Sequence, residues 1–266
     1  MPDTDESRVA AGYDLVYEAV PRSPTLARIW REHACGPDYP AGFEHISFIT
    51  LDELRTFVND LRLTPGSRLI DLACGMGGPG LWVAREADAE LTGVDVSAVA
   101  VAAASARACS LGLDVRARFQ QGSFADTGIE PGSAAGVMSV DALQYAPDKR
   151  AALEEAARIL APGGRLVVAC FELEPERVAG LPVLGTDPVA DYAALLDAAG
   201  FDAMRYEETD RWLERLTAAY QSALDARSDL IAEMGEPAVQ ALAGEMSLTL
   251  QLKPYRRRVL IAATKR

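Results

Sequence analysis

The fold is decided by Arg68-Leu-Ile-Asp-Leu-Ala-Cys-Gly-Met-Gly-Gly-Pro-Gly80. This stretch begins as an apolar run that carries one acid, Asp71, and then becomes rich in glycine. The next segment, 81–86, has the composition of a helix. A strand, a glycine turn and a helix open a βαβ unit, and glycine is needed where the backbone turns tightly or lets a ligand lie against it. The stretch therefore predicts an α/β fold with a ligand at this turn.

Two ligands fit the turn. The spacing Gly75-x-Gly77-x-x-Gly80 matches the dinucleotide fingerprint, which as a lone motif is a weak signal. The alternative is the turn that binds S-adenosylmethionine (SAM) in class I methyltransferases, which Asp71–Gly77 resembles closely. The sulfonium and ammonium groups of SAM are cationic, so a carboxylate at the strand end suits them, whereas a pyrophosphate has no use for it. We favour SAM, and NAD stays open as the alternative.

Composition limits the class of protein. The chain has 266 residues, 49% of them hydrophobic, which is enough for one elaborated globular domain. The net charge of −13 disfavours nucleic acid as a partner, and the basic cluster 256–258 is interpreted as a solvated strand edge. No run approaches the roughly 20 apolar residues of a membrane span, so no membrane partner is expected. The acidic start and the four scattered cysteines favour a cytoplasmic protein without a signal peptide.

Strand and helix patterns alternate from residue 68 onward. Apolar runs predict strands at 68–73, 90–95, 115–121, 136–140, 165–170, 204–209 and 257–263. Helical patterns between them lie at 98–111, 149–160 and 189–199. This alternation predicts a doubly wound, mostly parallel, seven-stranded sheet with helices on both faces. Ligands bind such sheets at the carboxyl ends of the strands.

Two further helical regions flank this unit. Residues 1–64 are predicted to form an N-terminal helical cap, with Thr50 capping a helix at 51–61. Residues 65–266 then form the ligand-binding domain, with two lid helices inserted at about 211–252. Apolar residues at helical spacing mark this lid, and Trp212, Tyr220, Met234 and Met246 are candidates to line an acceptor pocket or to form core.

Four segments together resemble the small-molecule branch of the class I SAM-dependent methyltransferases, which includes the ubiquinone, sterol, tocopherol and natural-product sugar enzymes. They are 71–78, 94–97, 122–126 and 139–148, the last followed by 156–164. The resemblance implies a Rossmann-like fold, SAM as cofactor and S-adenosylhomocysteine (SAH) as product. It covers about 68–170 and weakens toward the end of the chain.

The resemblance also assigns roles in binding SAM. Asp71 stands near the ammonium group, the glycines of the turn pack against the methionine part, and Asp95 accepts both ribose hydroxyls. Val96 and Phe124 cover the adenine or belong to the core, and Tyr13 meets the SAM carboxylate or is a plain helix-face aromatic. Ser123 stands where the family usually has an aspartate for the adenine amino group. The full set of cofactor-binding candidates is Tyr13, Asp71, Ala73, Gly75, Gly77, Gly78, Asp95, Val96, Ser97, Gly122, Ser123, Phe124 and Asp141.

The catalytic residues are harder to assign. Where relatives often carry histidines facing the acceptor, this chain has Gln144 and Tyr145, which can orient the acceptor or bind the SAM carboxylate, or are ordinary loop residues. The two histidines of the chain lie in the cap. We take His45 as the first candidate for a general base and His33 as the second, and either can instead be structural. Because no metal-ligand spacing surrounds them, no metal is expected.

Methyl transfer from a sulfonium is an in-line displacement that needs chiefly alignment and exclusion of water. The expected function is SAM-dependent methylation of a small, partly apolar acceptor of natural-product type, on oxygen or carbon rather than nitrogen. The alternatives are a cyclase of the same fold that binds SAM without methylating, an NAD-dependent oxidoreductase and a SAM sensor. The oligomeric state stays open, and a homodimer is allowed.

Overall fold

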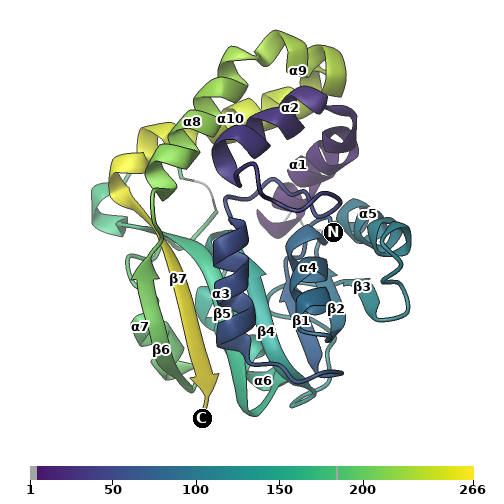
Figure 1. Cartoon of the computed structure of the whole chain (residues 1–266). Helices are drawn as coiled ribbons and strands as arrows, with labels where there is room; N and C mark the ends of the chain where they lie inside the picture. Colours follow the sequence, from purple (N-terminus) through teal and green to yellow (C-terminus); the bar gives the residue numbers. More distant parts are fainter. Residues whose placement is uncertain (1–4, 184) are drawn as a thin grey trace.

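The computed structural model describes residues 5–183 and 185–266, and its centre is one seven-stranded sheet (Figure 1). The strand order is β3-β2-β1-β4-β5-β7-β6. Strands β1 to β5 run parallel, and β7 is antiparallel to both of its neighbours. The bounds are β1 Arg68–Leu72, β2 Glu90–Asp95, β3 Ala117–Gln121, β4 Ala134–Val140, β5 Leu160–Leu173, β6 Phe201–Glu208 and β7 Arg256–Lys265. The predicted doubly wound, mostly parallel sheet is confirmed.

The strands are apolar throughout because both faces of the sheet are buried. Neighbouring residues of β1 illustrate this, since Leu69 belongs to one hydrophobic core and Ile70 to the other. Helices α3 Leu51–Leu61, α4 Gly78–Glu86 and α5 Ala98–Ser110 cover one face, and α6 Lys149–Ile159 and α7 Ala193–Ala198 cover the other (Figure 1). This two-sided burial is the usual condition of a parallel sheet.

The helix starts follow their capping residues. Thr50 accepts a hydrogen bond from the backbone of Glu53, whose side chain accepts one in return from the Thr50 amide, so the predicted cap of α3 is a complete capping box. Ser97 caps α5 through its hydroxyl, which accepts a hydrogen bond from the amide of Ala100. Both helices therefore begin where the sequence predicts.

The cap and the lid form one layer over the carboxyl ends of the strands (Figure 1). The cap contributes α1 Asp5–Ala19, α2 Pro24–Ile29 and a π-helical turn at Trp30–Ala34, and the lid contributes α8 Trp212–Asp225, α9 Arg227–Met234 and α10 Glu236–Leu252. The lid has three helices where two were predicted, because α9 forms between the two predicted helices, set off from α8 at Ala226 and from α10 at Gly235. Short 3-10 turns lie at Val20–Arg22, Leu143–Tyr145, Pro175–Arg177 and Lys253–Tyr255.

Two details differ from the sequence-based expectation, and a third decides between two alternatives that the sequence leaves open. Helix α3 packs on the sheet beside α4, so the segment that covers the site ends before residue 51 rather than at 64. Arg256 and Arg258 are buried, so the basic cluster at the start of β7 is not a solvated edge. Trp212 and Met234 belong to the core between cap and lid. In the described part of the chain no helix is long and apolar enough to cross a membrane.

Candidate active site

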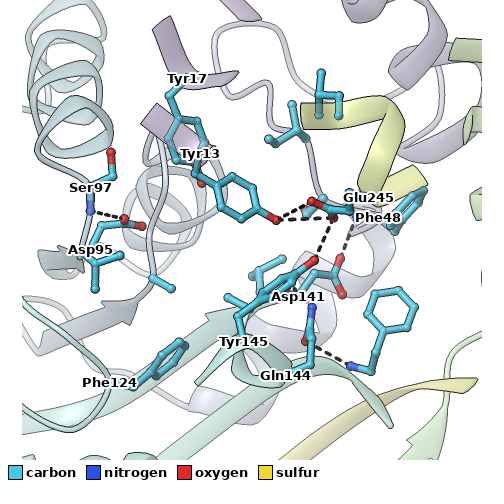
Figure 2. Close-up of a pocket in the computed structure, with 18 of the residues that line it drawn as sticks. Tyr13, Tyr17, Phe48, Asp95, Ser97, Phe124, Asp141, Gln144, Tyr145 and Glu245 are labelled. Carbon is cyan, nitrogen blue, oxygen red and sulfur yellow. Dashed lines mark hydrogen bonds between the residues drawn. The ribbon is translucent and has the colours of Figure 1, made fainter. Parts of the chain in front are cut away.

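The main cavity lies at the carboxyl ends of the central strands, beneath the cap and the lid (Figure 2). It holds about 1240 Å³ of space, part of it open to solvent. One end is formed by the segments after β2 and β3, with Asp95 and Ser123 among its residues. The other end is apolar and aromatic, lined by Leu26, Trp30, Phe48, Phe171, Tyr220, Leu242 and Met246. The cavity thus has a polar end at the sheet and an apolar end under the helices.

A smaller pocket of about 450 Å³ lies beside the main cavity along the glycine turn. Its wall includes Asp71, Gly75 and Gly78, and it shares Tyr17 and Ala73 with the main cavity. The two spaces therefore meet at the end of β1. Together they provide a polar channel that continues into an apolar chamber. Such a shape suits a polar ligand in the channel next to an apolar ligand in the chamber.

Asp95 organises the polar end. Its Oδ2 accepts a hydrogen bond from the Gly75 amide at 2.8 Å, and its Oδ1 accepts one from the Ser97 amide at 2.9 Å. Burial raises the pKa of this carboxyl group. Because a carboxylate has about four lone-pair sites, both oxygens keep the capacity to accept from a ligand. Ser97 also donates to Asp14 of α1, which joins the cap to this end of the cavity.

Asp71 lies at the end of β1 and lines the smaller pocket. Its side chain is so close to α4 that a Cβ added at Gly80 would lie 2.3 Å from Oδ2. Burial and the nearby charge of Asp95 raise the pKa of Asp71. A cationic group in this pocket would offset the cost of holding that carboxylate ionised, so the site suits an ammonium or sulfonium group.

The backbone of the turn is strained where it borders both spaces. Ala73 has a φ of 56°, in a region that non-glycine residues rarely adopt and that costs about 1–3 kcal/mol. Gly77, by contrast, faces away from both spaces, because a Cβ there would meet Ala104 and Phe119. Its predicted contact with the methionine part of the cofactor stays a prediction.

The segments after β2 and β3 form the wall opposite the glycine turn. Val96, Gly122, Ser123 and Phe124 all line the main cavity, as expected for an adenine site. The Ser123 hydroxyl accepts from the Asp126 amide at 3.1 Å, which leaves its own proton available to a ligand. Figure 2 shows Phe124 as an aromatic side chain at this wall.

Tyr13 faces Glu245 rather than the glycine turn. Its hydroxyl donates to Glu245 of α10 at 3.2 Å, on the apolar side of the cavity (Figure 2). The position above the glycine turn belongs to Tyr17, one helical turn later, whose hydroxyl would lie 3.1 Å from a Cβ at Gly75. Tyr17 is not among the residues predicted from the sequence, although its four-residue spacing from Tyr13 puts both on one helix face.

Asp141 and Gln144 line the cavity, but their side chains are occupied by structural bonds. Asp141 accepts from the Phe48 amide at 2.7 Å and from Arg258 Nε at 2.7 Å. Gln144 Nε2 donates to the Asp141 carbonyl at 2.5 Å, and its Oε1 accepts from the Phe171 amide at 3.3 Å. These contacts give both residues a structural role in the walls of the site, and their contacts with the cofactor and the acceptor stay predictions.

The Asp141 bonds belong to a buried ionic network that joins the cap, the lid and the sheet. Arg258, with a side chain 0% exposed, also donates to Glu53 of α3 at 2.8 Å. Glu53 accepts in addition from Arg215 of α8 at 3.1 Å, and Arg215 donates to the Phe48 carbonyl at 2.7 Å. The cap segment around Phe48 is therefore fixed to both the sheet and the lid.

The structure does not support either histidine as a general base. His45 lines the smaller pocket, its Nδ1 accepts from the Ser47 amide at 3.1 Å, and the remaining proton of the neutral ring is then on Nε2. Burial, with the charge of Arg107, lowers the pKa of His45 to about 3. His33 lines none of these spaces and lies beside Glu32 at the surface of the cap. On these grounds we propose neither histidine as the base.

We expect His45→Asn to keep kcat within about threefold, because an amide oxygen can replace Nδ1 as the acceptor for Ser47 and no proton transfer is lost. The same variant should change the pH dependence of stability. The folded pKa of about 3 lies below the reference 6.5, so His45 removes stability from the wild type as pH falls from 6.5 toward 3. Thermal melting over this range measures the effect, and a kcat loss of 100-fold would restore the base role.

Glu245 is the acid that sequence analysis missed. Its carboxylate accepts from Tyr145 at 2.8 Å and from Tyr13 at 3.2 Å (Figure 2). Burial raises its pKa. The signal was present, because Glu245 falls on the apolar stripe of α10 between Leu242 and Met246, where a charged residue has no structural purpose.

The comparisons agree with this geometry. Residues 69–164 match a family model described as a methyltransferase domain. The 27-O-demethylrifamycin SV methyltransferase of Amycolatopsis mediterranei (strain S699) is 28% identical over 80% of this chain and 80% of its own length. Residues 69–164 therefore form a methyltransferase domain, and the chain is similar to class I SAM-dependent methyltransferases. The chain is an enzyme with SAM as its cofactor, and the NAD interpretation of the glycine turn is set aside.

Solved structures share the fold. The (4+2)-cyclase SpnF aligns with a TM-score of 0.76 at 24% identity, covering 98% of this chain and 96% of that one. A geranyl diphosphate methyltransferase in complex with SAM aligns with a TM-score of 0.62 at 20% identity, covering 81% of this chain and 85% of its own. The first alignment includes the cap and the lid as well as the sheet.

Proposed function

We propose that this enzyme transfers the methyl group of SAM to oxygen or carbon of a small, partly apolar acceptor of natural-product type. The observation that carries the proposal is the main cavity, whose polar end meets the glycine turn and whose apolar end is closed by aromatic side chains of cap and lid. The apolar end excludes water and holds a hydrophobic acceptor in line with the sulfonium.

The cofactor would lie along the polar channel. In this proposal Asp95 accepts from the ribose, Asp71 faces the ammonium group, and Val96, Ser123 and Phe124 surround the adenine. Tyr17, rather than Tyr13, covers the methionine part, because its hydroxyl lies over Gly75. The buried carboxylates at the ends of β1 and β2 support these roles.

The direct test is an incubation of the enzyme with SAM and a panel of hydroxylated polyketides, phenols and terpenoids. We expect one member of the panel to gain a methyl group for each SAH formed, as measured by mass spectrometry. SAH that binds to an enzyme unable to methylate any member would count against the proposal. A homodimer remains a prediction, which light scattering can test.

A second candidate is a cyclase that binds SAM without using its methyl group. It is favoured by the alignment with the (4+2)-cyclase SpnF, which extends over cap, sheet and lid. Cyclisation leaves the mass of the substrate unchanged and releases no SAH. The same incubation therefore separates the two functions.

Filling the apolar end should block the acceptor and spare the cofactor. Leu242 of α10 lines this end, away from the smaller pocket. We expect Leu242→Trp to lower kcat/KM by about 100-fold or more, because loss of acceptor alignment alone is worth that much. SAH affinity, measured by calorimetry, should stay within about twofold. Equal losses of kcat/KM and of SAH affinity would mean that the apolar end and the polar end of the cavity are not separate sites.

A further inference from the structure

We propose that Glu245 accepts the proton of the acceptor during methyl transfer, so that the group methylated is a hydroxyl. Tyr13 and Tyr145 then serve as positioning residues for the Glu245 carboxylate. The inference rests on the methyl transfer proposed above and adds to it the acceptor class and the base.

The other ionisable groups at the main cavity are unsuited to this task. They are Tyr13, Tyr17, Tyr145, Tyr220, Asp95 and Asp141. Burial raises the pKa of every one of these tyrosines further above 10, so they remain protonated at neutral pH. Asp141 is paired with Arg258, and Asp95 is bonded to two backbone amides at the polar end. Glu245 is the remaining acid of this lining, and it lies on the apolar side.

The contacts of Glu245 hold its carboxylate in a fixed place. Tyr145 donates to Oε1 at 2.8 Å from the loop after β4, and Tyr13 donates to Oε2 at 3.2 Å from α1. The two tyrosine rings pack edge to face at 5.9 Å, which restricts both phenols. With two donors on a carboxylate that has about four lone-pair sites, Glu245 can still accept from a third.

The electrostatic surroundings favour a proton acceptor that works near neutral pH. Glu245 is faced by four neutral phenols, those of Tyr13, Tyr17, Tyr145 and Tyr220. The cation that faces it is Arg256, at the start of β7. Burial raises the pKa of Glu245 by more than Arg256 and the phenol hydrogen bonds lower it. A carboxylate of raised pKa is a stronger base than an exposed one and suits a hydroxyl whose acidity grows as the bond to carbon forms.

The proposed step is balanced without a further reactant. A lone pair of the acceptor oxygen forms the new bond to the methyl carbon as the carbon–sulfur bond breaks, and that electron pair stays on sulfur in SAH. The hydroxyl proton passes to Glu245 and then to solvent. An amine acceptor would need no base for the displacement itself, so a half-buried carboxylate that lines the acceptor end favours a hydroxyl.

The test compares Glu245→Gln with Glu236→Gln, a matched change at an exposed glutamate of the same helix that lines neither space. The probes are SAM labelled with ¹³C in its methyl group and a panel of naphthols, hydroxylated macrolactones and the corresponding amines. We expect NMR to place the label on oxygen. Glu245→Gln should lower kcat by about 100-fold or more. KM and the SAH affinity of this variant should stay within about twofold, and Glu236→Gln should behave as wild type.

The pH profile separates a base from a structural group. Wild-type kcat should rise with pH through one ionisation, because only the ionised carboxylate accepts a proton. The kcat of Glu245→Gln should not show this rise with pH. Label on nitrogen or carbon, or a Glu245→Gln enzyme with the wild-type profile, would overturn the role of Glu245 while methyl transfer stands. SAH binding without transfer to any member would instead remove the proposed function as well.

A further readout needs no acceptor. The pKa of Glu245 in the folded chain lies above its unfolded value of 4.5, so the carboxyl group stabilises the fold below pH 4.5 and loses that contribution as pH rises through the folded pKa. The melting temperature of Glu245→Gln relative to wild type should therefore increase as pH rises from 4 to 8. A difference that is constant over this range would contradict the buried, titrating carboxylate on which the inference depends.

Discussion

Asp95→Asn is expected to weaken SAH binding by about 100- to 10 000-fold, because two hydrogen bonds to a charged carboxylate are worth about 1.5–3 kcal/mol each. The effect has two sources. The carboxylate faces the cavity where the ribose is proposed to lie, and it also holds the amides of Gly75 and Ser97 at 2.8 and 2.9 Å. An amide side chain keeps only one acceptor and introduces a donor opposite one of these amides.

Titration calorimetry measures the loss, and Asp126→Asn is the matched control. Asp126 is an exposed acid in the segment after β3, and it lines neither pocket. The control should bind SAH as the wild type does. A folded Asp95→Asn chain with unchanged SAH affinity would move the ribose away from the end of β2 and require a different placement of the cofactor.

Arg258→Met is expected to lower the free energy of unfolding by about 3–5 kcal/mol, because removing one partner of a buried ion pair leaves the others charged and uncompensated. The side chain of Arg258 is 0% exposed and bonds both Asp141 and Glu53, whose own side chains are 6% and 13% exposed. For a chain of this size the change corresponds to a fall in melting temperature of roughly 6–20 °C.

The control for this variant is Arg55→Met. Arg55 pairs with Asp52 on the same helix as Glu53, but the two side chains are 60% and 88% exposed, and such pairs contribute about 0–1 kcal/mol. Adding Asp141→Asn to Arg258→Met should lower the free energy of unfolding by less than Asp141→Asn alone does. In the double variant the carboxylate charge that Asp141→Asn removes has already lost its partner. Equal melting temperatures for Arg258→Met and Arg55→Met would show that the network does not hold the cap in place.

The sheet could be predicted from the sequence because its signals are local and periodic. The run from Arg68 to Gly80 places strand, turn and helix in one continuous motif, and Ser97 and Thr50 mark helix starts by their own side chains. Asp71 and Asp95 could be placed at the ligand-binding edge for the same reason, since parallel strands present their carboxyl ends together. The lid is less regular, and α9, which lies between the two predicted lid helices, has no clear periodic signal.

The acceptor side could not be predicted in the same way, because it depends on contacts between distant segments. Glu245 meets Tyr145 across 100 residues and Tyr13 across 232. Asp141 was assigned to the cofactor by its place after β4, but Arg258, 117 residues away, occupies its carboxylate. His45 is the first base candidate because the cap is expected to meet the cofactor there, and only the fold reveals that its ring accepts from Ser47 and that its pKa is lowered.

The most direct test of methyl transfer in this cavity is the fate of the methyl group of SAM. The measurement is the mass of the acceptor after a single incubation with SAM bearing a trideuterated methyl group, together with the amount of SAH formed. We predict that all three deuterium atoms appear in the acceptor, with one SAH for each labelled product, and that Leu242→Trp suppresses both together. An acceptor that is converted without gaining deuterium, while SAM remains intact, would contradict methyl transfer and identify the cofactor as a structural ligand.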